Sequence, residues 1–484
     1  MIKSKDRPWQ DKLRERFRCI KTLGGGGNGT VYHVYDKKTA QEVAVKLLKR
    51  MGKEREHRFT AEIRVVEQLA GSIDGIIPIL ESAPEEYWYA MPVAKTILKH
   101  IGETQAAAKD IVSGVIQIAE TLSQLHARGI SHRDIKPANI LFYQNRYCLS
   151  DFGLVSLPDD PDHFTRSDKG LGAIFTIAPE MKRDPKHADG KKADVFSLAK
   201  TLWMLLTGDD KGFDGVYNSF DKSHSLRYID KLSSEHLVEL ENLLTVSTYN
   251  NPALRPDMTA FRDSLVEWLE ISQDLERTQA SEWNFINKYL FGDNMPESVA
   301  WSNLETIIRV LNAVGTLRAF NHMLFPDGGG LDFMLAEPAA ETDCICIYDT
   351  LNIPHIVKPE KLHFETFGED QVWSYFLLEL SFLEPVLPDT KISDYRELLE
   401  EDTPGHYVSS RDSVYGVYDY DTEEPLPEGH RSVFRYLKGS FLIVLKGSPY
   451  NGIPETYDGR HSQCIDKEFR NVVIPLVQPV KMRD

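Results

Sequence analysis

The chain has 484 residues, of which 42% are hydrophobic and 27% are charged, so it has the composition of a globular protein with two or three domains. It has no stretch of about 18 apolar residues, and its first 18 residues are rich in charged side chains and lack an apolar core, so we expect neither a membrane-spanning helix nor a signal peptide. The five cysteines are few and scattered, which favours a reducing compartment, and we expect a cytoplasmic location.

The net charge of −17 is confined to the second half of the chain. Residues 273–484 contain 35 Asp and Glu against 18 Lys and Arg, whereas the first 272 residues contain 38 of each. This break predicts a domain boundary near residue 272. The acidic half argues against binding to nucleic acid, and a solvated surface explains its charge more simply than a site for a basic partner.

A glycine-rich segment follows the first predicted strand, residues 17–23. Glycines let the backbone approach a phosphate group closely, because no Cβ intervenes. A dinucleotide-binding loop would lead into a helix, but residues 30–35 are mostly β-branched or aromatic, so we expect a hairpin between two strands. The positions of interest in this segment are Gly24, Gly26, Gly29 and Val31.

Two more strands and a helix are predicted before residue 95. Residues 42–48 form a strand that carries Lys46, and residues 54–70 have the apolar periodicity of a helix. Residues 87–93 are typical of a buried strand that ends near a proline. Together with the first hairpin, these elements predict a β-rich domain with one helix.

The next predicted helix, residues 106–128, leads to a loop with several polar side chains. The loop spans residues 131–141 and holds Asp134, Lys136 and Asn139, and its internal proline excludes a helix. Asp151-Phe152-Gly153 begins twelve residues after Asn139. In this order, after a glycine loop and a lysine-bearing strand, the pattern resembles the catalytic loop and the DFG motif of serine/threonine protein kinases.

The resemblance implies a bilobal α+β fold and a phosphoryl-transfer activity. We expect a β-rich small lobe over residues 1–95, a helical large lobe over residues 96–272, and a separate α+β accessory domain over residues 273–484. The implied substrates are ATP and the hydroxyl groups of proteins, with Mg²⁺, or alternatively Mn²⁺, as the metal.

The same resemblance assigns a nucleotide site in the small lobe. Lys46 would hold the α- and β-phosphates and pair with Glu62, which lies beside the apolar stripe of its helix; Glu56 and Glu67 are the competing partners. Ala90 would lie at the back of the cleft. The further nucleotide contacts that the resemblance implies are Gly24, Gly26, Gly29, Val31, Ala44 and the backbone of Met91 and Val93.

Roles in catalysis and metal binding follow for the loop residues. Asp134 would accept or orient the proton of the attacking hydroxyl group, and Lys136 would neutralise charge on the transferred phosphoryl group. Asn139 and Asp151 would bind the metal through oxygen atoms.

The segment from Asp151 to Glu180 would control activity. The resemblance implies that Arg133 would receive a phosphate group from Thr165 or Ser167, although ordinary hydroxyl groups explain these two residues equally well. The family usually has Gly-Thr before Ala-Pro-Glu, whereas this chain has Gly172-Ala173, which leaves the choice of Ser or Thr acceptors less certain; Thr176 lies nearby.

Further family features support the large lobe. Asp194 would bind the backbone of the catalytic loop at the start of a central helix, and Arg255 would pair with Glu180. A last helix is expected over residues 261–269.

The second half resembles no family that we recognise. We expect a helix over 300–324, a turn at 328–330, and an acidic, loop-rich stretch over 389–428; the expected strands are 344–348, 353–357, 373–382 and 441–445. Cys344 and Cys346 would share one face of a strand rather than bind a metal. His322, His355 and His363 are too far apart in sequence to predict a metal site.

The leading hypothesis is an ATP-dependent serine/threonine protein kinase that also phosphorylates itself, with a C-terminal domain that recruits a substrate or a regulator. A catalytically silent scaffold that senses ATP is an alternative, but the chain retains all the polar residues assigned to catalysis. A kinase of small molecules is disfavoured by Arg133 and by the Ala-Pro-Glu segment.

Overall fold

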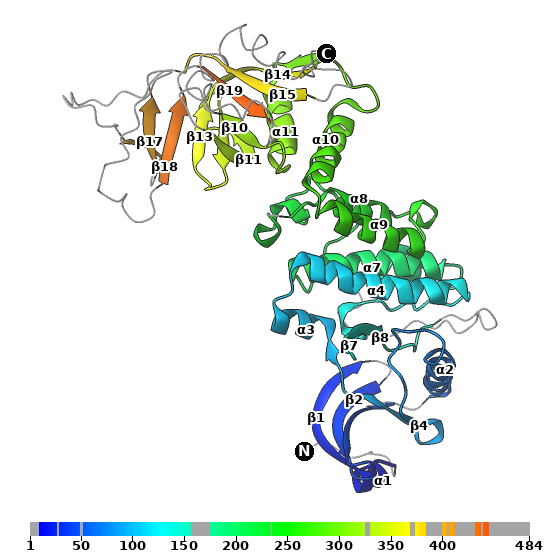
Figure 1. Cartoon of the computed structure of the whole chain (residues 1–484). Helices are drawn as coiled ribbons and strands as arrows, with labels where there is room; N and C mark the ends of the chain where they lie inside the picture. Colours follow the sequence, from blue (N-terminus) through cyan, green and yellow to red (C-terminus); the bar gives the residue numbers. More distant parts are fainter. Residues whose placement is uncertain are drawn as a thin grey trace, which may run out of the picture. The chain divides into compact units, whose positions relative to one another are not determined.

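The computed structural model describes residues 9–26, 29–48, 52–155, 175–233, 235–324, 330–367, 373–383, 399–403, 406–411, 431–436 and 439–444. The chain divides into two compact units, Met1–Asp274 and Leu275–Asp484 (Figure 1). This division lies close to the break in charge at residue 272. Each unit is described by itself below.

A five-stranded antiparallel sheet in the order β1-β2-β3-β5-β4 forms the small lobe of the first unit. The glycine-rich segment lies in the hairpin between β1 and β2, with Gly26 paired to Gly29. The elements are α1 (Trp9–Arg16), β1 (Phe17–Gly26), β2 (Gly29–Asp36), β3 (Gln41–Leu47), α2 (Lys53–Leu69), β4 (Glu81–Ala83), a 3₁₀ turn (Pro84–Glu86) and β5 (Trp88–Pro92).

The two faces of this sheet bury different sets of side chains. On one face, Phe59 and Ile63 of α2 pack with Ala44, Tyr89 and Met91. On the opposite face, Leu13 of the N-terminal helix α1 packs with Phe17, Val34, Val43, Val45, Ala83, Trp88 and Ala90. The position of α2 beside the sheet is visible in Figure 1.

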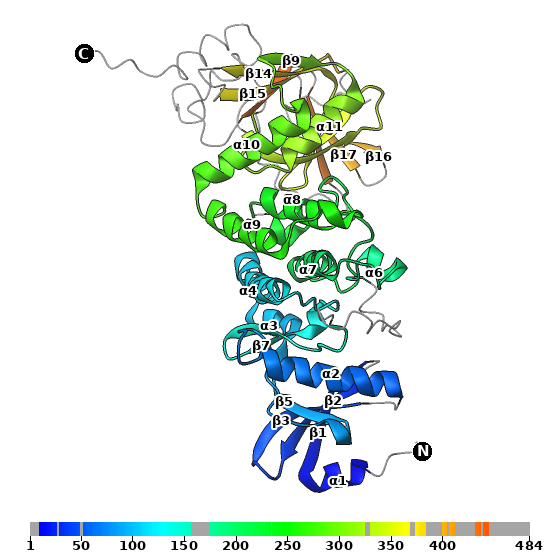
Figure 2. The same ribbon diagram turned by 90° about the vertical axis from the view of Figure 1, so that its right-hand side faces the viewer.

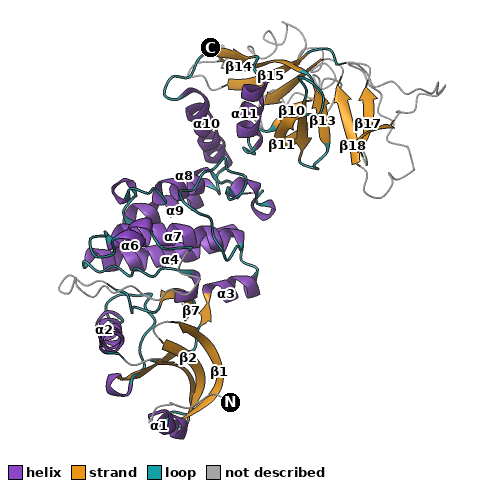
Figure 3. Ribbon diagram, turned by 180° about the vertical axis from the view of Figure 1, so that it is seen from behind, coloured by secondary structure: helices purple, strands orange, loops and turns teal. Residues whose placement is uncertain are grey.

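Helices dominate the large lobe of the first unit, as Figure 3 shows. A small sheet of three strands lies at its start. The elements are β6 (Lys95–Thr96), α3 (Ile97–Thr104), α4 (Ala108–Ala127), β7 (Ile140–Tyr143), β8 (Arg146–Leu149), α6 (Pro179–Arg183), α7 (Gly190–Thr207), α8 (Val238–Ser247) and α9 (Met258–Ile271), with 3₁₀ turns at Pro137–Asn139, Leu226–Tyr228, Asp230–Leu232 and Pro252–Leu254.

Helix α7 is the centre of this lobe. Every residue from Ala193 to Leu206 is buried, and α4, α8 and α9 pack around it (Figure 2). The Asp189 side chain accepts hydrogen bonds from two backbone N–H groups at its start, and Gly208 ends it with a left-handed φ of 76°. The sequence therefore defines both ends of the helix that supports the catalytic loop.

Glu180 and Arg255 join α6 to the segment before α9, as predicted. Arg255 Nη1 lies 2.6 Å from Glu180 Oε1, and Nη2 lies 2.9 Å from Oε2. Arg255 also donates to the carbonyl groups of Tyr249 and Lys192. The last helix is longer than predicted, because Asp257 caps it at 258.

The second unit contains an eleven-stranded sheet in the order β16-β17-β18-β13-β12-β11-β10-β19-β15-β14-β9. Only the pairs β13–β18 and β17–β18 are parallel among the described strands. The elements are α10 (Leu275–Phe291), β9 (Ser298–Trp301), α11 (Leu304–Gly315), β10 (His322–Leu324), β11 (Gly330–Pro338), β12 (Ile345–Asp349), β13 (Pro354–Val357), β14 (Pro359–Phe367), β15 (Trp373–Leu380), β16 (Leu399–Thr403), β17 (His406–Arg411), β18 (Arg431–Tyr436) and β19 (Gly439–Val444).

The long helix predicted over 300–324 is wrong, because α11 covers only its centre. Asn303 caps α11 at its start, and β9 and β10 occupy the two ends of the predicted range. A Cβ at Gly315 would lie 2.8 Å from the carbonyl oxygen of Met334, so the helix ends where it meets β11. The stretch predicted to be loop-rich contains β16 and β17. Of the glycines predicted to form a turn, Gly328 and Gly329 lie outside the described residues and Gly330 begins β11.

Helices α10 and α11 pack on the sheet of the second unit. Trp283 of α10 stacks on Phe320 and Phe364, with ring centroids 5.0 and 6.0 Å apart. Asn312 of α11 exchanges two hydrogen bonds with the backbone of Ala336 in β11. These contacts link the helices to strands that are distant in sequence.

Three histidines and two cysteines among the described residues of the second unit have neighbours that explain their positions. Cys344 and Cys346 are buried in one apolar cluster. His322, His355 and His363 each lie beside a carboxylate, in the pairs His322–Asp332, His355–Asp349 and His363–Glu379. Across the described part of the chain, no three His, Cys, Asp or Glu side chains form a metal-binding group, and no helix has the length and apolarity needed to cross a membrane.

Candidate active site

Lys46, Glu62 and Asp151 meet between the small and large lobes of the first unit. Lys46 Nζ lies 2.6 and 2.9 Å from the two carboxylate oxygens of Glu62 and 2.9 Å from Asp151 Oδ1. The hydroxyl group of Tyr89 donates a hydrogen bond to Oε1 of Glu62, with 2.9 Å between the two oxygen atoms. The predicted pair of Lys46 with Glu62 is therefore present, and it extends to a third residue from the DFG motif.

The charges of Lys46 and Asp151 reinforce each other, whereas burial and the nearby Asp151 carboxylate raise the pKa of Glu62. Burial alone would lower the pKa of Lys46, but the carboxylates of Asp151 and Glu62 raise it well above its usual value. Burial would likewise raise the pKa of Asp151, but the ammonium group of Lys46 holds it below its usual value. Both groups are therefore charged at neutral pH, as phosphate and metal binding would require.

The catalytic loop holds Asp134, Lys136 and Asn139 together. Lys136 Nζ lies 2.7 Å from Asp134 Oδ2. Asn139 Nδ2 donates to the carbonyl oxygen of Asp134 at 2.8 Å and to its Oδ2 at 3.0 Å. Asp134 is only partly buried, so its carboxylate is fixed in orientation and still open to solvent on one side.

Asp194 holds the backbone of this loop in place, as predicted. Its carboxylate accepts hydrogen bonds from the N–H groups of His132 and Arg133 at 2.8 and 2.7 Å, and His126 Nε2 lies 2.9 Å away. Arg133 and Asp151 both adopt a left-handed backbone, with φ of 66° and 63°. Non-glycine residues seldom adopt this conformation, and at Arg133 the backbone N–H is held by Asp194.

Phe152 turns inward and Asp151 turns toward Lys46. The Phe152 ring is buried and contacts the ring of His132 edge to face, with centroids 4.8 Å apart. Ser150 donates its N–H and its hydroxyl group to the carbonyl oxygen of Asn139. These contacts hold the segment that carries Asp151 beside Asn139, so the two residues predicted to bind metal are neighbours.

The glycine hairpin lies close to the strand that carries Lys46. A Cβ at Gly29 would lie 2.6 Å from the carbonyl oxygen of Leu47, so only glycine fits at this position. Val31 pairs with Lys46 across β2 and β3. Gly24 has open space around it, and Gly26 ends the first strand.

The prediction that Ala90 lies at the back of the cleft is wrong. Ala90 points to the opposite face of the sheet, where it packs with Val45 and Trp88. Met91 is on the cleft side, where it pairs with Ala44 across β3 and β5. The side chain behind the nucleotide site is therefore a methionine.

An apolar surface on this side of the sheet joins the small lobe to β7. Ala44 and Met91 are buried in it, and Val31, Ala94 and Leu141 pack against them. Val93, by contrast, is 38% exposed. The residue types alone did not predict Ala94, Leu141 or the hydroxyl group of Tyr89, because only the paired strands and packed lobes bring them to the site.

The predicted regulatory residues are described only in part. Thr165 and Ser167, like Gly172 and Ala173, lie outside the described residues. Arg133 is partly buried, and burial lowers its pKa to about 10. A Cβ at Gly190 would lie 2.6 Å from Arg133 Nε, so the guanidinium group lies against the start of α7.

Comparison with known proteins decides the family. The family described as "Protein kinase domain" matches residues 17–266, which is more than half of the chain. The chain belongs to the protein kinase family. The fold predicted for the first unit is thereby confirmed as a protein kinase fold with a β-rich small lobe and a helical large lobe.

Relatives of the kinase region have similar names. "Serine/threonine-protein kinase PrkC" from Bacillus subtilis is 29% identical over 205 residues, which cover 41% of this chain and 31% of that protein. "Serine/threonine-protein kinase Pkn1" from Myxococcus xanthus is 32% identical over 216 residues, covering 40% of this chain and 29% of that protein. "DNA damage-responsive serine/threonine-protein kinase RqkA" from Deinococcus radiodurans is 27% identical over 206 residues, 40% of this chain and 30% of that protein. The kinase therefore spans about a third of the length of these relatives.

Proposed function

We propose that the chain transfers the γ-phosphoryl group of ATP to serine or threonine hydroxyl groups of proteins. The observation that carries the proposal is the convergence of Lys46, Glu62 and Asp151 beside the loop that holds Asp134 and Asn139. These residues are far apart in sequence, and the fold brings their charges together at one place. The relatives' names and the family match support the same activity.

In the proposed reaction, the chain's residues position two substrates and receive one proton. The hydroxyl oxygen of the acceptor forms a bond to the γ-phosphorus, the bond from that phosphorus to the β–γ bridging oxygen breaks, and ADP leaves. Asp134 takes the hydroxyl proton, and Lys136 offsets the negative charge near it. Lys46 would bind the α- and β-phosphates, held in place by Glu62.

Asn139 and Asp151 fit a divalent metal. Both side-chain hydrogen bonds of Asn139 use its Nδ2 atom, so its Oδ1 atom is left for a ligand. Lys46 contacts Asp151 through Oδ1, and Oδ2 remains available among the described residues. Amide and carboxylate oxygens suit Mg²⁺, and an ion held by these two residues would supply positive charge that offsets the negative charge of the phosphate groups of ATP.

The test is phosphoryl transfer from labelled ATP, with Mg²⁺, to a generic basic protein and to the chain itself. We expect transfer by the natural chain, loss of it in Asp134→Ala, and full activity in Asp263→Ala, which removes an exposed carboxylate of α9. Equal transfer by the natural chain and by Asp134→Ala would refute the proposal.

Regulation by phosphorylation is a further part of the proposal. We expect the chain to phosphorylate Thr165 or Ser167, with Arg133 as the receiving cation, and residues 275–484 to recruit a substrate or a regulator. Mass spectrometry of the purified chain, with Asp134→Ala as the control, tests the modification. The cytoplasmic location stays a prediction from the cysteine content.

A further inference from the structure

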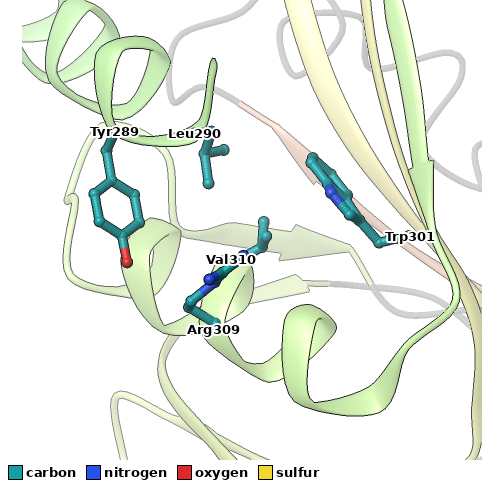
Figure 4. Close-up of a pocket in the computed structure, with 5 residues that line it drawn as sticks. All are labelled: Tyr289, Leu290, Trp301, Arg309 and Val310. Carbon is teal, nitrogen blue, oxygen red and sulfur yellow. The ribbon is translucent and has the colours of Figure 1, made fainter. Parts of the chain in front are cut away.

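A small pocket in the second unit lies between α10, β9 and α11. Its volume is about 160 Å³, and it is lined by Tyr289, Leu290, Trp301, Arg309 and Val310 (Figure 4). Figure 4 shows Tyr289 and Trp301 on opposite sides, with Leu290 and Val310 between them. The pocket thus combines two aromatic walls, two aliphatic side chains and one cation.

The cation is available to a ligand. Arg309 is exposed, and among the residues that the structure describes it makes no ion pair and no hydrogen bond. Glu305 lies one turn earlier on α11, the arrangement that favours a pair along a helix, yet Arg309 lines the pocket and does not pair with Glu305. Within the same described part of the chain, the indole N–H of Trp301 also has no acceptor.

The volume limits the size of the ligand. An engineered protein cavity of about 150 Å³ accommodates benzene, so a pocket of this size takes one six-membered ring. Tyr289 stacks on Phe285 and Trp301 stacks on Phe291, and both rings also line the pocket. Leu290 and Val310 complete the apolar surroundings of a bound ring.

The charge limits its chemical class. A guanidinium group matches a carboxylate through two parallel hydrogen bonds. Residues 273–484 carry 17 more negative than positive charges, and this excess disfavours anions with several charges, such as phosphates. One arginine in an acidic unit therefore suits a single negative charge.

We propose that this pocket binds a small carboxylate that carries one aromatic ring. The carboxylate lies on Arg309, and the ring lies between Tyr289 and Trp301. The proposal concerns the second unit and does not depend on phosphoryl transfer by the first.

The probe is phenylacetate, and its neutral analogue phenylacetamide is the comparison. Saturation-transfer NMR and titration calorimetry on the full chain should show that phenylacetate binds with a dissociation constant on the order of millimolar or tighter. Phenylacetamide and acetate should each bind about tenfold more weakly, since each lacks one of the two matched groups.

Two variants distinguish an effect of the pocket from an effect of the net charge of the chain. Arg309→Gln should abolish the preference for phenylacetate over phenylacetamide. Lys288→Gln removes the same charge from an exposed position of α10 that does not line the pocket, and it should keep the preference. The proposal is overturned if the natural chain, with an intact circular dichroism spectrum, binds no phenylacetate, or if Arg309→Gln leaves the preference unchanged.

Discussion

The buried ion pair between Glu180 and Arg255 should contribute far more to stability than a surface pair of equal length. The Arg255 side chain is 0% exposed and donates two hydrogen bonds to Glu180. Glu180→Gln keeps the shape of the side chain but leaves the buried guanidinium group without a negative partner. Such a loss costs about 3 kcal/mol or more.

Arg262 and Asp263 provide a matched control. Arg262 Nη2 lies 2.6 Å from Asp263 Oδ1, the same distance as the shorter contact of the buried pair, but these side chains are 32% and 59% exposed. Solvent screens the exposed pair, so Asp263→Asn should cost at most about 1 kcal/mol.

Hydrogen exchange of the amides of α7, measured by mass spectrometry, reports unfolding of the first unit separately from the second. A loss of about 3 kcal/mol accelerates exchange roughly a hundredfold, whereas 1 kcal/mol accelerates it about fivefold. If Glu180→Gln accelerates exchange no more than Asp263→Asn does, burial does not determine the strength of the pair and the reasoning is refuted.

Three further predictions concern the small lobe. Lys46→Met should lower kcat/KM for ATP at least about a hundredfold. Glu62→Gln should lower it less, because Lys46 still pairs with Asp151; equal losses in steady-state assays would contradict this order. Met91→Ala should let the kinase use ATP with a bulky group on the adenine amine, whereas Ala90→Gly should not, as competition assays would show. A hydrogen bond from Arg16 lowers the pKa of Asp36 to about 2, so the stabilising effect of the Asp36 carboxylate is complete above about pH 4 and disappears as the pH falls toward 2. Asp36→Asn should therefore reduce the loss of unfolding free energy between about pH 4 and pH 2, measured by urea unfolding, and an unchanged loss would contradict this prediction.

The catalytic loop could be predicted because its chemistry depends on residue types in a fixed order. Asp134, Asn139 and Asp151 carry oxygen atoms that few other residue types could replace, and local sequence decides where they lie. The pairing of Glu62 with Lys46 could be inferred in the same way, because the apolar stripe of one helix orients Glu62.

The register of β5 could not be predicted from the sequence. Trp88, Tyr89, Ala90 and Met91 are all buried and apolar or aromatic, so no alternation distinguishes the face toward the cleft from the opposite face. Only the pairing of Met91 with Ala44 settles which side chain lies behind the nucleotide site.

The end of α11 could not be predicted from the sequence either, because it depends on long-range packing. The helical periodicity of apolar residues continues beyond Gly315 with Leu317 and Phe320, which are both buried. The contact of Gly315 with β11 depends on a strand that comes later in the chain, so no local pattern marks it.

The hydrogen bonds of Asp194 have a mechanical consequence. They fasten the loop that carries Asp134 to α7, so this loop moves with the large lobe as one body. Lys46 belongs to the other body, and its 2.9 Å contact with Asp151 crosses between the two. A hinge rotation of the small lobe would therefore separate Lys46 from Asp151 while Asp134 keeps its place on the large lobe.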